Sequence, residues 1–82
     1  MPRYFFDIHD GMTVIDNFGR ELPSIIAAKS EAMQIASIFA TEPKMIGCNG
    51  GAIVINIREA PGLILATIRL VFSVEMNDVH ES

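Results

Sequence analysis

The sequence AIVINIREAPGLILATIRLVF, residues 52–72, carries the strongest structural signal in the chain. Isoleucine recurs at every second position from Ile53 to Ile57, which is the period of a β-strand with one buried face. A Pro-Gly turn signal separates this run from a second apolar run. We predict strands from Ala52 to Arg58 or Glu59 and over Leu63–Met76, joined by a loop of two residues, or of four with the same parity. This register pairs Ile53 with Leu70, Ile55 with Ile68 and Ile57 with Ala66, because a shift by one residue would set Thr67 and Arg69 against the isoleucines.

The N-terminal segment predicts a second hairpin. Side chains alternate from Arg3 to His9, with aromatic and apolar residues at every second position. Asp10-Gly11 tolerates the positive φ angles of a two-residue type I′ loop, so Met12–Asp16 is expected to return as a strand. This register sets Phe6 opposite Ile15 and Ile8 opposite Thr13.

One helix is predicted between the two hairpins. Ser24 is a suitable N-cap, the segment from Ile25 to about Thr41 has no Gly or Pro, and Pro43 ends the helix. A glycine-rich connector follows over residues 44–51. One stripe about 100° wide is expected to face the sheet, and it contains Ile25, Ala28, Ala32, Ile35, Ala36 and Phe39. Ile26, Met33 and Ile38 lie outside it.

These elements predict an α+β fold of order ββαββ, a two-layer sandwich with one helix on one face of a four-stranded antiparallel or mixed sheet. The face under the helix is expected to contain Tyr4, Phe6, Ile8, Ile53, Ile55, Ile57, Ile68, Leu70 and Phe72. We expect one domain over residues 1–76 and a frayed tail over 77–82. The most apolar strands, Arg3–His9 and Leu63–Met76, are expected at the centre of the sheet.

The opposite face of the sheet is mixed in character, and the last strand is longer than its partner. Once Ala52 pairs with Val71, Phe72–Met76 have no partner in the hairpin, and an unpaired apolar edge favours association. We therefore expect a homo-oligomer, with a two-fold dimer as the commonest closed form. The predicted interaction surface contains Phe5, Val54, Arg58, Arg69, Val71, Phe72, Val74, Ile26 and Met33.

Composition and charge argue against several classes of protein. The 82 residues are 50% hydrophobic and 20% charged, which is far from the composition of disordered chains. The net charge of −4 opposes binding to nucleic-acid phosphates and to anionic membranes. Cys48 has no second cysteine to pair with, and we recognise neither a signal peptide nor a membrane span. We therefore expect a cytoplasmic protein without nucleic-acid or membrane partners.

Asp7, His9 and Asp16 are the best candidates for chemistry. Asp7 and His9 share a strand face, and the hairpin brings Asp16 close to Asp7. One imidazole with two carboxylates can hold a divalent cation or pair an acid with a base. Each residue also has a structural explanation, since Asp16 begins a turn and Asp7 can pair with an arginine such as Arg69. We favour the structural explanation and assign no catalytic residue, metal or cofactor.

Two further motifs do not support a function. The segment around Cys48, GCNGG, matches neither a cysteine-protease nucleophile motif nor a phosphate-binding loop. Phe5 with Arg58 and Arg69 lacks the sequence motif of an RNA-binding sheet.

The opening RYFFD at residues 3–7, with His9-Asp10-Gly11 and Glu21-Leu22-Pro23 before an alanine-rich helix, resembles a family of short bacterial proteins described only as a domain of unknown function. The resemblance spans almost the full chain. That family commonly has an acidic residue after the proline, where this chain has Ser24, an equivalent cap. The resemblance implies a compact cytoplasmic domain and supplies no activity, cofactor or catalytic residue.

We therefore expect a small non-enzymatic protein-interaction or regulatory module that self-associates. The alternative is a small-ligand or divalent-metal-binding protein that uses Asp7, His9 and Asp16. A concave pocket lined by these three side chains would favour the alternative, and a flat apolar surface would favour the first reading.

Overall fold

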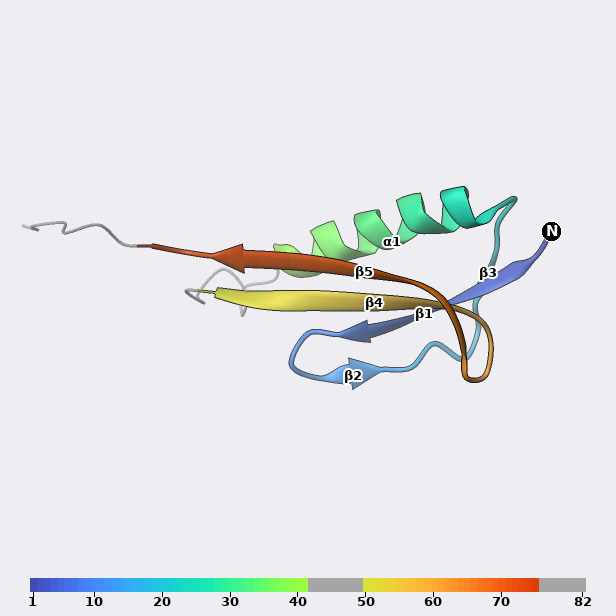
Figure 1. The fold of residues 1–82 in the computed structure, drawn as a ribbon, viewed down its shortest axis with the longest axis horizontal. Coiled ribbons are helices and arrows are strands. Elements are labelled where there is room, and N and C mark those ends of the chain that lie inside the picture. Colours follow the sequence, from blue (N-terminus) through green and yellow to red (C-terminus); the bar gives the residue numbers. More distant parts are fainter. Residues whose placement is uncertain (42–49, 76–82) are drawn as a thin grey trace, which may run out of the picture.

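The computed structural model describes residues 1–41 and 50–75, and this part of the chain forms one helix and five strands (Figure 1). The elements are β1 (Arg3–His9), β2 (Thr13–Val14), β3 (Arg20–Glu21), α1 (Ile25–Ala40), β4 (Gly50–Ala60) and β5 (Leu63–Ser73). All strand pairs are antiparallel, the order is β2-β1-β4-β5, and β3 pairs with β1. The predicted α+β class is confirmed. The predicted ββαββ order with four strands is wrong, because β3 has only two residues and shows no recognisable alternation.

The β4–β5 hairpin has the predicted register. Ile53 pairs with Leu70, Ile55 with Ile68 and Ile57 with Ala66. Ala60 pairs with Leu63, so the loop consists of two residues, and Gly62 in this loop has a φ of 76°. The register shifts between Ile57 and Ala60. Such a bulge lets the strands accommodate a turn whose twist fits a hairpin poorly.

β5 lies at an edge of the sheet and not at its centre. β4 separates it from β1, and no strand of the described residues pairs with its other side. The predicted central position was wrong, because a run of apolar residues does not show how many neighbours a strand has. β4 begins at Gly50, inside the predicted connector, so Phe72 pairs with Gly51 and Ser73 with Gly50, and the prediction that these two were unpaired is also wrong. Residues 42–49, with Pro43, and residues 76–82, with the predicted tail, lie outside the described residues.

The N-terminal hairpin differs from its prediction by one residue. β1 has the predicted bounds, but β2 is shorter than predicted and pairs Val14 with Ile8 and Thr13 with His9. The predicted pairs with Ile15 and Thr13 were wrong, because the loop has three residues, in which Gly11 has a φ of 99°. β2 therefore gives this edge of the sheet a strand of only two residues.

The helix begins at the predicted cap and covers the predicted face. The Ser24 hydroxyl accepts the Ala27 N–H at 3.3 Å, and the helix ends at Ala40. The core contains Ala28, Ala32 and Ala36 of α1 with Tyr4, Phe6, Ile8, Ile53, Ile55 and Ile57 of β1 and β4. Small side chains let the helix lie close to the sheet, so the predicted isoleucine face is buried. Ile25 and Leu70, which were expected in this core, are exposed.

Candidate functional site

The open face of the sheet holds a buried ion pair between Asp7 of β1 and Arg58 of β4. Arg58 Nε donates to Asp7 Oδ2 at 2.6 Å and Nη2 donates to Oδ1 at 3.0 Å. Asp7 is only 6% exposed. The predicted partner, Arg69, was wrong, because it lies on β5 and β4 separates that strand from β1. Arg58 also covers the ring of Phe5 at 5.0 Å from its centroid, a cation–π contact.

Asp16 anchors the loop that follows β2. Its Oδ2 accepts the backbone N–H of Phe6, and its Oδ1 accepts those of Phe18 and Gly19 at 2.9 and 3.0 Å. Its own N–H donates to Asp7 Oδ1, and its carbonyl accepts from Arg58 Nη2. Gly19 has a φ of 69°, and a Cβ there would lie 2.9 Å from the carbonyl oxygen of Tyr4. The loop is therefore held against β1 by backbone contacts that only a glycine permits at this position.

Both carboxylates are held in the ionised form. The hydrogen bond from Arg58 is the main cause that lowers the pKa of Asp7 below its ordinary value, against the opposing effect of burial. Burial acts to raise the pKa of Asp16, but the N–H donors of Gly19, Phe18 and Phe6 and the charge of Arg58 outweigh it and lower that pKa. Asp7 in turn raises the pKa of Arg58. A carboxylate stabilised in this way is a poor proton acceptor near neutral pH.

His9 belongs to a different row of side chains. The Thr67 hydroxyl donates to Asn56 Oδ1 at 2.8 Å, the Asn56 amide lies 3.4 Å from His9 Nε2, and His9 Nδ1 lies 3.1 Å from the Thr13 hydroxyl. This polar ladder, defined as Thr67, Asn56, His9 and Thr13, crosses β5, β4, β1 and β2. No pattern in the sequence indicated the role of Asn56, because the strand order decides which side chains meet.

The structure therefore separates the predicted triad. It brings Asp7 and Asp16 together around Arg58, and it places His9 in the polar ladder. Among residues 1–41 and 50–75, no group of three or more His, Cys, Asp or Glu side chains is arranged to hold a metal ion. Cys48 lies outside the described residues.

A cavity of about 410 Å³ opens between the loop after β2 and the helix. Asp16, Asn17, Gly19 and Arg20 contribute its polar wall. Its apolar wall consists of Phe6, Ile8, Val14, Ile15, Phe18 and Ile35. Neither Asp7 nor His9 lines it. A pocket lined by Asp7, His9 and Asp16 together would have favoured ligand binding. This cavity is lined by Asp16 but not by the other two residues.

The β5 side of the molecule carries an exposed apolar surface. On β5 itself Leu63, Ile64, Leu65, Leu70 and Val71 are exposed, and Val74 follows them. Arg69 is also exposed, Phe72 is half-buried, and Phe5 and Val54 are half-buried on the open face. Arg58, in contrast, is engaged with Asp7. The residues predicted for the interaction surface thus divide into an exposed group along β5 and α1 and a group already occupied within the sheet.

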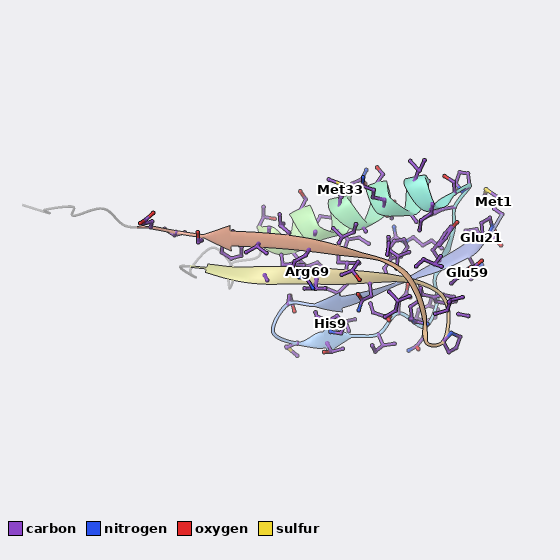
Figure 2. All side chains as sticks on the ribbon, in the orientation of Figure 1. Met1, His9, Glu21, Met33, Glu59 and Arg69 are labelled. Atoms are coloured by element: carbon purple, nitrogen blue, oxygen red, sulfur yellow. The ribbon has the colours of Figure 1, made fainter. Side chains whose placement is uncertain are left out.

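The exposed helix residues lie on two different flanks. At 3.6 residues per turn, Ile26 and Met33 lie on one side of the buried alanines and Ile38 on the other. The Ile38 flank also carries Glu31, which pairs with Arg20 of β3. The flank with Ile26 and Met33 therefore faces away from β3 and β1, toward the β5 side, and Figure 2 shows Met33 on α1, on the side of the molecule opposite β2.

Comparison with known proteins gives one match. A family model with the description Domain of unknown function (DUF6894) matches residues 3–71. No curated protein and no solved structure matches significantly. Within the described residues, no helix is long and apolar enough to cross a membrane.

Proposed function

We propose, from the premise that this chain belongs to the family Domain of unknown function (DUF6894), that it is a non-enzymatic interaction module that self-associates through the β5 edge. The match covers residues 3–71 and confirms the family resemblance expected from the opening motif. The family description names no activity, so the proposal depends on the surface of the molecule.

One observation carries the proposal, namely the length and composition of β5. It is an edge strand of eleven residues, with Arg69 as its single charge and with no proline. Protein edges that remain free are usually short, charged or interrupted. Among these protections β5 has Arg69 and a bulge near its turn, and Val71, which lies away from the bulge, is 65% exposed. A strand of this kind is stable in solution when another strand covers it.

The open face supports a structural and not a catalytic role for the polar residues. The Asp7 and Asp16 carboxylates are occupied by Arg58 and by backbone donors, and they fix the loop after β2. Binding of a divalent cation or small ligand by Asp7, His9 and Asp16, the alternative function, would require breaking these bonds. The arrangement therefore favours the interaction module over the ligand-binding protein.

The experiment is sedimentation of the wild-type chain and two variants at micromolar concentration. We expect the wild type to sediment at twice the chain mass of 9.0 kDa. Val71→Lys places a charge on the β5 edge and is expected to sediment as a monomer. Val14→Lys makes the same exchange on β2 at the opposite edge, and it is expected to remain associated.

A wild type that sediments as a monomer throughout this range would contradict the proposal. Equal effects of the two lysine substitutions would also contradict it, because association would then not depend on β5.

A further inference from the structure

The geometry of β5 restricts how two copies can pair. When two identical edge strands pair antiparallel about a two-fold axis, that axis stands perpendicular to the sheet. Both helices then lie on the same side of one continuous sheet. Directly opposite residues of an antiparallel pair point to the same face, so the numbers of paired residues must have the same parity. One residue of β5 therefore lies opposite its own copy.

We propose that this residue is Ile68, so that the two β5 strands pair antiparallel over their full length about a two-fold axis between the two Ile68 residues. The inference rests on the proposed self-association and specifies its partner, a second copy of this chain, and its register. Ile68 is the central residue of β5, with five residues on each side. This register spans all eleven residues of β5, more than any other symmetric register, and its five central residues, 66–70, lie outside the bulge at Leu65.

The side chains that meet in this register are compatible on both faces. On the helix side Leu70 lies opposite Ala66. The bulge at Leu65 pairs Ile64 with Arg58, so Ile64 lies on the open face. Arg69, the single charge in the strand, lies opposite Thr67. A shift of the axis to Arg69 would place two arginines directly opposite each other, which is unfavourable.

The helix flank that carries Ile26 and Met33 completes the contact. α1 contacts β4 and β5, so its axis lies about one to one and a half strand spacings from the two-fold axis. Because neighbouring strands are about 4.8 Å apart, the axes of the two helices are about 10–14 Å apart. Long apolar side chains reach across such a gap, since packed helices lie about 8–10 Å apart. Ile26 is 76% exposed and Met33 is 55% exposed. In the pair these side chains lie over the junction of the two β5 strands.

The area required by a stable dimer supports this role for the helix. Eleven residues at about 3.4 Å each and a sheet thickness of about 10 Å give an edge of roughly 370 Å² per copy. Standard interfaces bury about 800 Å² per partner. The strand edge alone supplies about half of that area, so an apolar surface beside it is needed. Ile26, Met33 and Leu70 are the exposed residues in that position.

The register is tested by disulfide formation between chains in a Cys48→Ser background, which removes the single native thiol. Thr67→Cys and Arg69→Cys change two exposed residues of the open face. Opposite residues have Cα atoms about 4.5–5.5 Å apart, which suits a disulfide. Thr67 and Arg69 are each one position from the axis, so each is offset by two positions from its own copy and lies about 8 Å from it, which does not suit a disulfide. We expect a mixture of the two variants to form about tenfold more cross-linked dimer than either variant alone.

The outcomes separate the register from self-association. Cross-linking by Thr67→Cys alone, or by Arg69→Cys alone, would show a different axis and overturn the register while association stands. Absence of all cross-links in a chain that sediments as a dimer would overturn pairing through β5 itself. A monomeric wild type would overturn both proposals.

The helix contact is tested by a matched pair of exposed residues on opposite flanks of α1. We expect Met33→Glu to weaken dimerisation about tenfold or more, and Ile38→Glu to change the dissociation constant by less than about twofold. Equal effects would show that the helix flank does not take part.

Discussion

At the scale of single residues, the Asp7–Arg58 pair joins three segments that are distant in the sequence. Arg58 bonds both Asp7 oxygens and the carbonyl of Asp16, and Asp7 bonds the Asp16 N–H. A partly satisfied polar cluster in such a position is costly, because each remaining group loses a partner that water does not replace. These few atoms therefore determine how the loop after β2 lies on the sheet.

Asp7→Asn tests this role. The substitution keeps the shape of the side chain but removes its charge, so the hydrogen bonds with Arg58 weaken. We expect the free energy of unfolding in urea to fall by about 2 kcal/mol. Glu59→Gln, which alters an exposed carboxylate on β4, is the control and is expected to change it by less than about 0.5 kcal/mol. A loss of equal size in both variants would contradict the assignment.

The two carboxylates also predict a dependence of stability on pH. The pKa values of Asp7 and Asp16 lie below the ordinary value of 3.8 in the folded chain. The stability that they provide is therefore complete above that value and is lost as the pH falls through the lower, folded-state pKa values. We expect a constant urea midpoint from neutral pH to about pH 5 and a fall below about pH 4, with a shallower fall in Asp7→Asn. An identical acid profile in the variant would exclude Asp7 as a source.

At the scale of elements, local sequence signals were reliable where several residues carried them. The alternating isoleucines of β4 fixed the pairs with Leu70, Ile68 and Ala66, and Ser24 marked the start of the helix. Elements that depend on few residues were missed, as with the two residues of β3. The DG turn signal was also misleading, because it does not distinguish a loop of two residues from the observed loop of three.

The candidate site could be predicted only in part, because it depends on strand order. The sequence identified Asp7 and Asp16 as neighbours, and the structure brings both to Arg58. It could not select Arg58 over Arg69, since both were expected on the same face and only the position of β4 next to β1 decides between them. The hydrogen bonds of Asp16 to backbone N–H groups leave no pattern in a sequence.

The cap of α1 gives a prediction at this scale. Ser24→Ala removes the oxygen that accepts the Ala27 N–H, and we expect the free energy of unfolding to fall by about 1 kcal/mol. Ser30→Ala makes the same exchange at an exposed position inside the helix, where alanine is the better helix former, so stability should stay equal or rise slightly. Thermal or urea unfolding followed by circular dichroism distinguishes the two. A similar loss in both variants would contradict the cap.

At the scale of the whole molecule, one helix covers one face of the sheet, and the core that results is small. Nine apolar residues of the described part are buried, and three of them are alanines. A chain of this size buries a smaller share of its surface than a larger domain and is only marginally stable alone. Pairing through β5 would add apolar contacts outside this core.

The proposed dimer predicts that thermal stability rises with protein concentration. Because a dimer dissociates when it unfolds, its Tm increases with the concentration of chains, whereas the Tm of a monomer does not. We expect the Tm of the wild type to rise when the protein concentration is increased a hundredfold. The Tm of Val71→Lys should stay constant over the same range. A wild-type Tm that is independent of concentration would contradict the dimer.

The unequal edges of the sheet limit the size of any assembly that forms through strand pairing. β5 offers eleven residues, whereas β2 at the other end of the strand order offers two. Growth into a fibre needs a pairing surface at both ends of each added unit. A chain with one such surface has no long edge left once two copies have paired through β5. The expected product is therefore a finite dimer and not an extended aggregate.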